Sequence, residues 1–295
     1  MITTDNNISI SVAGKIKAYY ELLKFRLSAL VAFSGAFGYS LAVETINWER
    51  LTLISLAGFL ITGAANIVNQ IIEKDLDKLM KRTQNRPLPT GRLTVKEAQL
   101  FCLILFIIST YILFFEFNYK AGVLGVVSFL LYGFVYTPLK RVGPISVLVG
   151  AFPGAFPPMI GWLAATNSFG LEPGILFAIQ FFWQFPHFWA IAWVADEDYC
   201  RAGFKMLPNN GHKDLRTAIT IMIYTIFLVP CAFVPHLLHM TGEVSAMVAV
   251  LVSVMFLSQT FYLMLKPTDK AALMMMFGSF LYLPVLQIAF LMDKL

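Results

Sequence analysis

The feature that most constrains this chain is a series of long apolar runs, each about as long as a lipid bilayer is thick. A helix rises about 1.5 Å per residue, so roughly 20 apolar residues cross a hydrocarbon core of about 30 Å. Backbone groups in lipid must be satisfied internally, which favours helices for such runs. We therefore predict an all-α integral membrane protein with nine transmembrane helices, over residues 26–45, 51–72, 97–116, 121–138, 144–165, 173–194, 217–237, 244–265 and 272–292.

The composition supports this fold class. The chain is 58% hydrophobic and 13% charged, whereas a soluble domain is about half apolar and a quarter charged. Two of the nine runs are unusual for membrane spans. The fourth run is short, and the fifth contains Pro153, Pro157 and Pro158, which predict a kinked or broken helix.

The cations are placed asymmetrically along the chain. If the N-terminus is cytoplasmic, 19 of the 22 Lys and Arg residues fall in cytoplasmic segments, and only Arg50, Lys120 and Lys294 lie outside. This distribution follows the positive-inside rule and puts the C-terminus outside, in a protein of the bacterial cytoplasmic (inner) membrane. The net charge of +5 therefore reflects topology and does not indicate a nucleic-acid partner.

We divide the chain into two parts. Residues 1–25 form a cytoplasmic N-terminal tail, disordered over 1–14, and a segment that lies along the membrane interface. Residues 26–295 form a single transmembrane domain.

The segment from Asn66 to Arg92 leaves an apolar run and turns strongly ionic. On a helix, Asn69, Glu73 and Asp77 share one face and Asp75 points away. Carboxylates four residues apart repel each other unless a cation lies between them. Oxygen ligands suit Mg²⁺, which binds one or two carboxylates and completes its shell with phosphate and water oxygens.

Cationic side chains follow this acidic face, and arginine forks fit phosphate oxygens. A second region repeats the order of polar helix face, acidic group and cations; drawn as one helix, it gives Gln180, Gln184, His187 and Asp198 a common face. The pattern predicts a site for a metal-bound diphosphate, with the candidate cations Lys81, Arg82, Arg86, Lys140, Arg141, Arg201 and Lys205. The alternative is a solvated loop whose charges only set topology.

Two motifs resemble a known family. The spacing Asn69-x3-Glu73-x3-Asp77, followed by Arg82-Thr83-x2-Arg86-Pro87-Leu88-Pro89, resembles the first aspartate-rich motif of the UbiA family of intramembrane prenyltransferases. The segments from Tyr136 to Arg141 and from Pro186 to Trp189 resemble the branch of that family that acts on haem.

Two positions depart from the family pattern. Glu73 stands where the family has Asp, and Asp198 is followed four residues later by Ala202. The metal ligand of the second region therefore stays open among Asp196, Glu197 and Asp198, and the helix-face argument favours Asp198.

The resemblance implies a UbiA-type helical bundle with a cytoplasm-facing active-site cavity. It implies transfer of a farnesyl group from farnesyl diphosphate to a vinyl group of haem B, with addition of water, giving haem O. Mg²⁺ would be the cofactor, Asn69, Glu73, Asp77 and Asp198 the catalytic metal ligands, and His187 and Trp189 the haem-binding residues. The product would pass to downstream haem-using or haem-modifying membrane proteins.

Two other functions remain open from the residues. A prenyltransferase that acts on a quinone or aromatic-acid precursor would share the diphosphate site without needing haem. A transporter of an anionic amphiphile would use the cations to bind cargo, but it would show no Mg²⁺ requirement.

Overall fold

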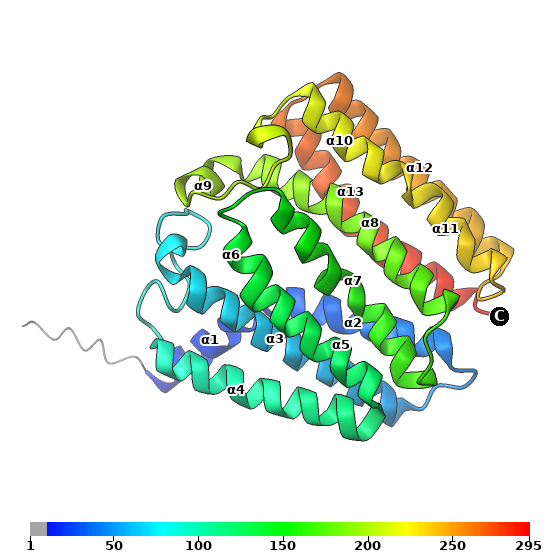
Figure 1. The fold of residues 1–295 in the computed structure, drawn as a ribbon, viewed down its shortest axis with the longest axis horizontal. Coiled ribbons are helices and arrows are strands. Elements are labelled where there is room, and N and C mark those ends of the chain that lie inside the picture. The colour runs from blue at the N-terminus through cyan, green and yellow to red at the C-terminus, as the bar shows by residue number, and fades with distance from the viewer. Residues whose placement is uncertain (1–10) are drawn as a thin grey trace, which may run out of the picture.

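The structure is a computed structural model that describes residues 11–295, so most of the tail predicted over residues 1–14 lies outside the described residues. Those residues form a bundle of long helices, with both chain halves packed around a common centre (Figure 1). In this part of the chain there is no strand, and nine helical segments are long and apolar enough to cross a membrane. The predicted fold class and the nine spans are confirmed.

The spanning segments have the following bounds. The first three are α2 (Phe25–Ala42), α3 (Trp48–Asp77) and α4 (Val95–Tyr111), which continues as a π-helical turn, Ile112–Phe117. The fourth joins α5 (Tyr119–Leu130) through a π-helical turn, Leu131–Tyr136, to α6 (Thr137–Leu139). The others are α7 (Ile145–Thr166), α8 (Leu171–Val194), α10 and α11 (Leu215–Ile226 and Leu228–Leu237), α12 (Glu243–Leu265) and α13 (Asp269–Met292).

Shorter helices lie outside the spans. A helix before the first span, α1 (Val12–Leu22), and the helix α9 (Asp196–Arg201) are both at the ends of spanning helices, and a 3₁₀ turn covers Asn209–Gly211. Polar caps define several helix starts: the Thr94 side chain and Glu97 form a capping box at α4, and Asn118 caps α5. These side chains satisfy backbone N–H groups that have no partner at a helix N-terminus.

The helix α7 is continuous, so of the predicted kink or break at its prolines the break does not occur. Pro157 and Pro158 lack the N–H groups that would bond to the carbonyls of Pro153 and Gly154. Side chains of neighbouring helices take their place: the Ser128 hydroxyl donates to the Pro153 carbonyl at 3.4 Å, and two glutamine amides from α8 donate to the Gly154 carbonyl. A proline-rich helix survives in the membrane because its neighbours satisfy the freed groups.

The helices α2 and α7 cross in close contact. A Cβ atom on Gly38 would collide with the backbone of Pro158, and one on Gly161 would collide with the Gly35 carbonyl. Small residues at a membrane helix crossing allow the backbones to approach. The two core clusters of the bundle, one mainly on α1 to α5 and one mainly on α7 to α13, meet here, since α2 and α7 contribute residues to both.

Candidate active site

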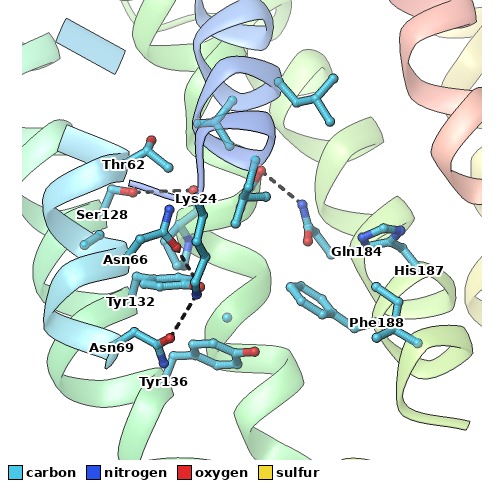
Figure 2. A pocket seen from close by; sticks show the side chains of 18 of the residues that line it. Lys24, Thr62, Asn66, Asn69, Ser128, Tyr132, Tyr136, Gln184, His187 and Phe188 are labelled. Carbon is cyan, nitrogen blue, oxygen red and sulfur yellow. Dashed lines mark hydrogen bonds between the residues drawn. The ribbon is translucent and has the colours of Figure 1, made fainter. Parts of the chain in front are cut away.

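A cavity of about 420 Å³ lies between α2, α3, α7, α8 and α13, a volume typical of small-molecule sites. Figure 2 shows polar side chains from facing helices that point into it. Its polar end contains acidic and amide side chains of α3 and cations of the connecting segments. Its remaining wall is mostly apolar, with Leu27, Leu30, Val31, Ile61 and Phe129.

The predicted acidic face of α3 lines the polar end. The helix extends five residues beyond the predicted end at Ile72, to Asp77, so the polar residues follow a helical register. Asn69, Glu73 and Asp77 are 1%, 3% and 0% exposed, whereas Asp75 lies on the outer side and pairs with Lys78 at 2.9 Å. The face predicted from helical spacing is therefore present, but it is buried inside the protein.

Each buried carboxylate has a cationic partner. Glu73 Oε1 lies 2.7 Å from Lys140 Nζ. Arg86 Nη1 donates to both carboxylate oxygens of Asp77, at 2.9 and 2.8 Å. Buried charges need such pairing, because leaving one alone is costly.

Lys24 is a site residue that the sequence analysis missed. It joins α1 to α2 in the left-handed backbone region (φ 47°), lines the cavity, and donates from Nζ to Asn69 Oδ1 at 3.1 Å (Figure 2). Burial and the nearby charges of Arg86 and Lys140 hold the Lys24 pKa well below its usual range. A lysine just before an apolar run looks like a topology anchor, so the sequence pattern gave no signal for this role.

Contacts of α3 with the α1–α2 junction hold Lys24 at the cavity. The Gln70 amide donates to the Leu22 carbonyl at 2.8 Å, and the Asn66 amide donates to the Leu23 carbonyl at 3.4 Å. The polar face of α3 thus contacts the α1–α2 junction and also lines the cavity.

The other predicted cations divide into two groups. Arg82, Arg86 and Lys140 line the cavity. Burial acts to lower the Lys140 pKa, but the Glu73 carboxylate outweighs it and the pKa is raised. The remaining four are exposed and outside the cavity lining: Lys81, Arg141, Arg201 and Lys205.

Asp198 also lies outside the cavity lining. The helix α8 ends at Val194 and the chain turns at Ala195 into α9, so the predicted common face of Asp198 with Gln180, Gln184 and His187 does not form. Its carboxylate accepts the backbone N–H groups of Lys81 and Arg82, each at 3.2 Å, and pairs with Arg201 at 3.0 Å.

These contacts set the ionisation of Asp198. Burial acts to raise its pKa, but the N–H groups of Arg82 and Lys81, with the Arg201 charge, lower it overall. In this arrangement Asp198 fixes the turn that follows α3 and so positions Arg82. Its role as a metal ligand stays a prediction.

His187 projects from α8 into the cavity (Figure 2), and its ring is hydrogen-bonded to Ser279 of α13. Its Nδ1 lies 2.9 Å from Ser279 Oγ, and that hydroxyl donates to the Met276 carbonyl at 2.6 Å. Ser279 Oγ is therefore assigned as the acceptor of an Nδ1–H proton, which leaves Nε2 as the nitrogen with a free lone pair. The ring also stacks on Trp183 at 4.3 Å.

Trp189 lies elsewhere. It is 4% exposed, packs against Phe185 and Tyr224, and is absent from the cavity lining. Trp183, six residues earlier on α8, is the tryptophan that lines the cavity.

The donor set at the polar end fits Mg²⁺. In residues 11–295 no three His, Cys, Asp or Glu side chains gather in a metal cluster. Two carboxylates and an amide oxygen line this end of the cavity, from Glu73, Asp77 and Asn69. Mg²⁺ typically takes one or two carboxylates and the oxygens of a bound phosphate, so these residues suffice when a diphosphate is present.

Known proteins resemble this chain over nearly its whole length. A protoheme IX farnesyltransferase of Cytophaga hutchinsonii is 52% identical over 96% of this chain and 100% of its own. One of Flavobacterium psychrophilum is 45% identical over 94% of each chain.

Solved structures share the fold. A digeranylgeranylglyceryl phosphate synthase matches with a TM-score of 0.80 and 19% identity over 95% of this chain and 98% of that one. A UbiA homolog from Archaeoglobus fulgidus bound to DMAPP and Mg²⁺ matches with a TM-score of 0.66 and 17% identity, over 90% of this chain and 99% of that one. The model of the UbiA prenyltransferase family matches residues 31–283. With a cavity that joins buried carboxylates and cations to an apolar wall, and with these relatives, the chain belongs to the UbiA prenyltransferase family.

Proposed function

We propose that the protein transfers the farnesyl group of farnesyl diphosphate to a vinyl group of haem B, with addition of water, and so makes haem O. The relatives named protoheme IX farnesyltransferase, at 52% and 45% identity over nearly the full length, support this substrate pair. The observation that carries the proposal is the cavity itself, which joins a cationic and acidic end to an apolar wall that bears a histidine.

The polar end binds the diphosphate. Lys24, Arg82, Arg86 and Lys140 line it and donate to phosphate oxygens. The exposed cations Lys81, Arg141, Arg201 and Lys205 lie outside the cavity lining and attract the anionic substrate over a longer range.

Asn69, Glu73 and Asp77 would hold Mg²⁺, and Asp198 is the further predicted ligand. Bound Mg²⁺ supplies positive charge that stabilises the departing diphosphate. In the ligand-free protein Lys140 and Arg86 neutralise the Glu73 and Asp77 carboxylates. With Mg²⁺ and substrate bound, the two carboxylates would be available to the metal, and Lys140 and Arg86 would be available to the phosphate oxygens.

Ionisation of the allylic diphosphate leaves a carbocation that needs shielding from solvent. Tyr132 and Tyr136 line the cavity beside the polar end, and their rings lie 5.2 Å apart. Aromatic faces stabilise positive charge, and the Lys140 ammonium already lies 4.8 Å from the Tyr136 ring centre. The farnesyl chain runs along the apolar wall of α2 and α3.

His187 contacts haem, with Nε2 directed at the iron. Trp183, stacked on the His187 ring, keeps that orientation. We place the protein in the bacterial inner membrane, N-terminus inside and C-terminus outside, because its cations gather in one set of connecting segments. The product then passes to haem-using or haem-modifying proteins of the same membrane.

The test is a lipid-reconstituted assay. Purified protein with haem B, farnesyl diphosphate and Mg²⁺ should give a pigment heavier by a farnesyl group plus a hydroxyl group, and EDTA should abolish it. Prenylation of a quinone precursor instead of haem would refute the acceptor while keeping the diphosphate site. The transporter alternative finds no support, since the matching family is one of prenyltransferases.

A further inference from the structure

One amide on the cavity wall has a fixed direction and no partner for its oxygen. Gln184 of α8 is 5% exposed and lines the cavity. Its Nε2 donates to the Gly154 carbonyl of α7 at 3.1 Å (Figure 2). That carbonyl is available because Pro158, four residues on, has no N–H to give it. A carbonyl accepts only from the nitrogen of an amide, so Gly154 fixes which way Gln184 faces.

The oxygen of Gln184 is the free end. Throughout the described part of the chain no group donates a hydrogen bond to Oε1, and Gln184 lines the cavity. The two glutamines beside it differ. Gln180 Oε1 accepts from Gln287 Nε2 at 3.2 Å, and Gln287 Oε1 accepts from the Ser34 hydroxyl at 3.3 Å. Gln184 therefore presents the one oriented acceptor among these three amides.

A buried polar oxygen without a partner costs about 1–3 kcal/mol, and an ordered water that bonds to it removes most of that cost. The neighbours of Gln184 on α8, Trp183 and Phe188, are aromatic, and the oxygens of Gln180 and Gln287 beside it already accept hydrogen bonds. A water molecule in this part of the cavity has a preferred position, with a proton donated to Gln184 Oε1 and its oxygen lone pairs free.

We propose that Gln184 holds the water molecule that adds to the haem substrate. This inference rests on the proposed function, which requires one water per turnover. Gln184 lies three residues before His187, roughly 4.5 Å of rise along the helix, and both line the cavity from α8. A porphyrin held at His187 therefore lies beside Gln184.

The step balances as follows. The C–O bond to the diphosphate breaks and its electron pair leaves with the diphosphate. The vinyl π pair forms the new C–C bond to the farnesyl carbon, which leaves a cation on the vinyl carbon next to the porphyrin ring. A lone pair of the held water forms the C–O bond, and the proton released goes to the departing diphosphate or to solvent. Without a held water the same cation loses a proton and gives an alkene, lighter by one water.

Two variants test the role by the ratio of these products. Gln184→Leu keeps the approximate side-chain volume and removes the acceptor. Gly154→Ala leaves Gln184 intact but displaces it, because a Cβ there would lie 2.6 Å from Nε2. Both should form farnesylated haem with a larger share of the dehydrated product, and with less incorporation of isotopically labelled water oxygen.

Gln180→Leu is the matched control. Gln180 also donates to the Gly154 carbonyl, at 2.7 Å, but its oxygen is already engaged by Gln287. Its product ratio should equal that of the wild type.

The outcomes separate the two proposals. A wild-type fraction of hydroxylated product in folded Gln184→Leu overturns the role of Gln184. Loss of all product from both variants, with substrate binding intact, also overturns it, because water adds after the C–C bond has formed. If Gln184→Leu fails to fold, Gly154→Ala decides by the same ratio. Wild-type protein that makes no farnesylated haem refutes the proposed function instead.

Discussion

Replacing Lys24 by methionine should weaken binding of the diphosphate substrate about 10- to 150-fold. The Lys24 ammonium lies at the polar end of the cavity, 3.1 Å from Asn69 Oδ1. Methionine keeps an unbranched side chain of similar length and removes the charge. A hydrogen bond to a charged group contributes about 1.5–3 kcal/mol, and about 1.4 kcal/mol corresponds to a factor of ten, which gives this range.

The same residue predicts a pH dependence. Burial, with Arg86 and Lys140 nearby, keeps the Lys24 pKa well below its usual range in the free protein. A bound diphosphate stabilises the ammonium form and raises that pKa. Binding therefore takes up a proton, and affinity falls as pH rises through the lowered pKa of the free protein. Lys24→Met should lose this part of the pH dependence.

Calorimetry with a non-reactive thio analogue of farnesyl diphosphate and Mg²⁺ measures both effects. Titrations in buffers of different ionisation enthalpy give the number of protons taken up. Lys15→Met is the matched control, because Lys15 pairs with Glu97 at 2.7 Å on α1 and α4, away from the cavity lining. Equal affinity of Lys24→Met and wild type, or a proton uptake that survives the substitution, would refute the reasoning.

Three further predictions concern the metal site, the helix crossing and the turn after α3. Glu73→Gln or Asp77→Asn should lower the transfer rate by about 10²- to 10³-fold, as expected for loss of one preorganised electrostatic group. Single-turnover kinetics measures this rate. A variant whose rate equals that of the wild type within error would show that its carboxylate is not part of the metal site. Gly161→Ala should destabilise the protein by about 1–3 kcal/mol through overpacking at the Gly35 carbonyl, which would lower the midpoint of thermal unfolding. Gly174→Ala is the control, because nothing lies within 4 Å of a Cβ at that position, and it should leave the midpoint unchanged. Asp198→Ala should raise KM for the diphosphate because the Lys81–Arg82 turn loses its acceptor, and Glu197→Ala should not. Since the Asp198 pKa is lowered in the folded protein, the ionised carboxylate also contributes to folding stability. This stability is present above the unfolded pKa of about 3.9 and is lost as pH falls through the folded value.

The span pattern and the acidic face were predictable because both are local. A run of about 20 apolar residues encodes a membrane helix whatever its neighbours are, and the 3.6-residue period alone brings Asn69, Glu73 and Asp77 to one side. The structure added that this side is buried, with Glu73 and Asp77 already paired to Lys140 and Arg86. Pairing between distant segments leaves no periodic signal in the sequence.

The bend at Ala195 and the role of Lys24 were not predictable for the same reason. One helix drawn through Ala195 puts Asp198 beside His187, but the chain turns there and Asp198 bonds instead to backbone N–H groups more than a hundred residues earlier. Lys24 reaches the cavity only because α3 side chains hold the α1–α2 junction.

The prolines of α7 show how a local irregularity becomes a functional feature. From the sequence alone, Pro153, Pro157 and Pro158 predicted a kinked or broken helix, and α7 is not broken. The missing proline N–H groups instead affect the interface with α8, where the freed Gly154 carbonyl accepts hydrogen bonds from the amides of Gln180 and Gln184. Glycine at position 154 is needed for this approach, since a Cβ would lie 2.6 Å from Gln184 Nε2. Proline and glycine together thus orient a polar side chain in a mostly apolar wall, and a polar group fixed at that depth is expected to bind something polar. A water-adding prenyl transfer supplies that partner, which is why the product ratio of Gly154→Ala tests the packing of α7 and the chemistry of Gln184 in one measurement.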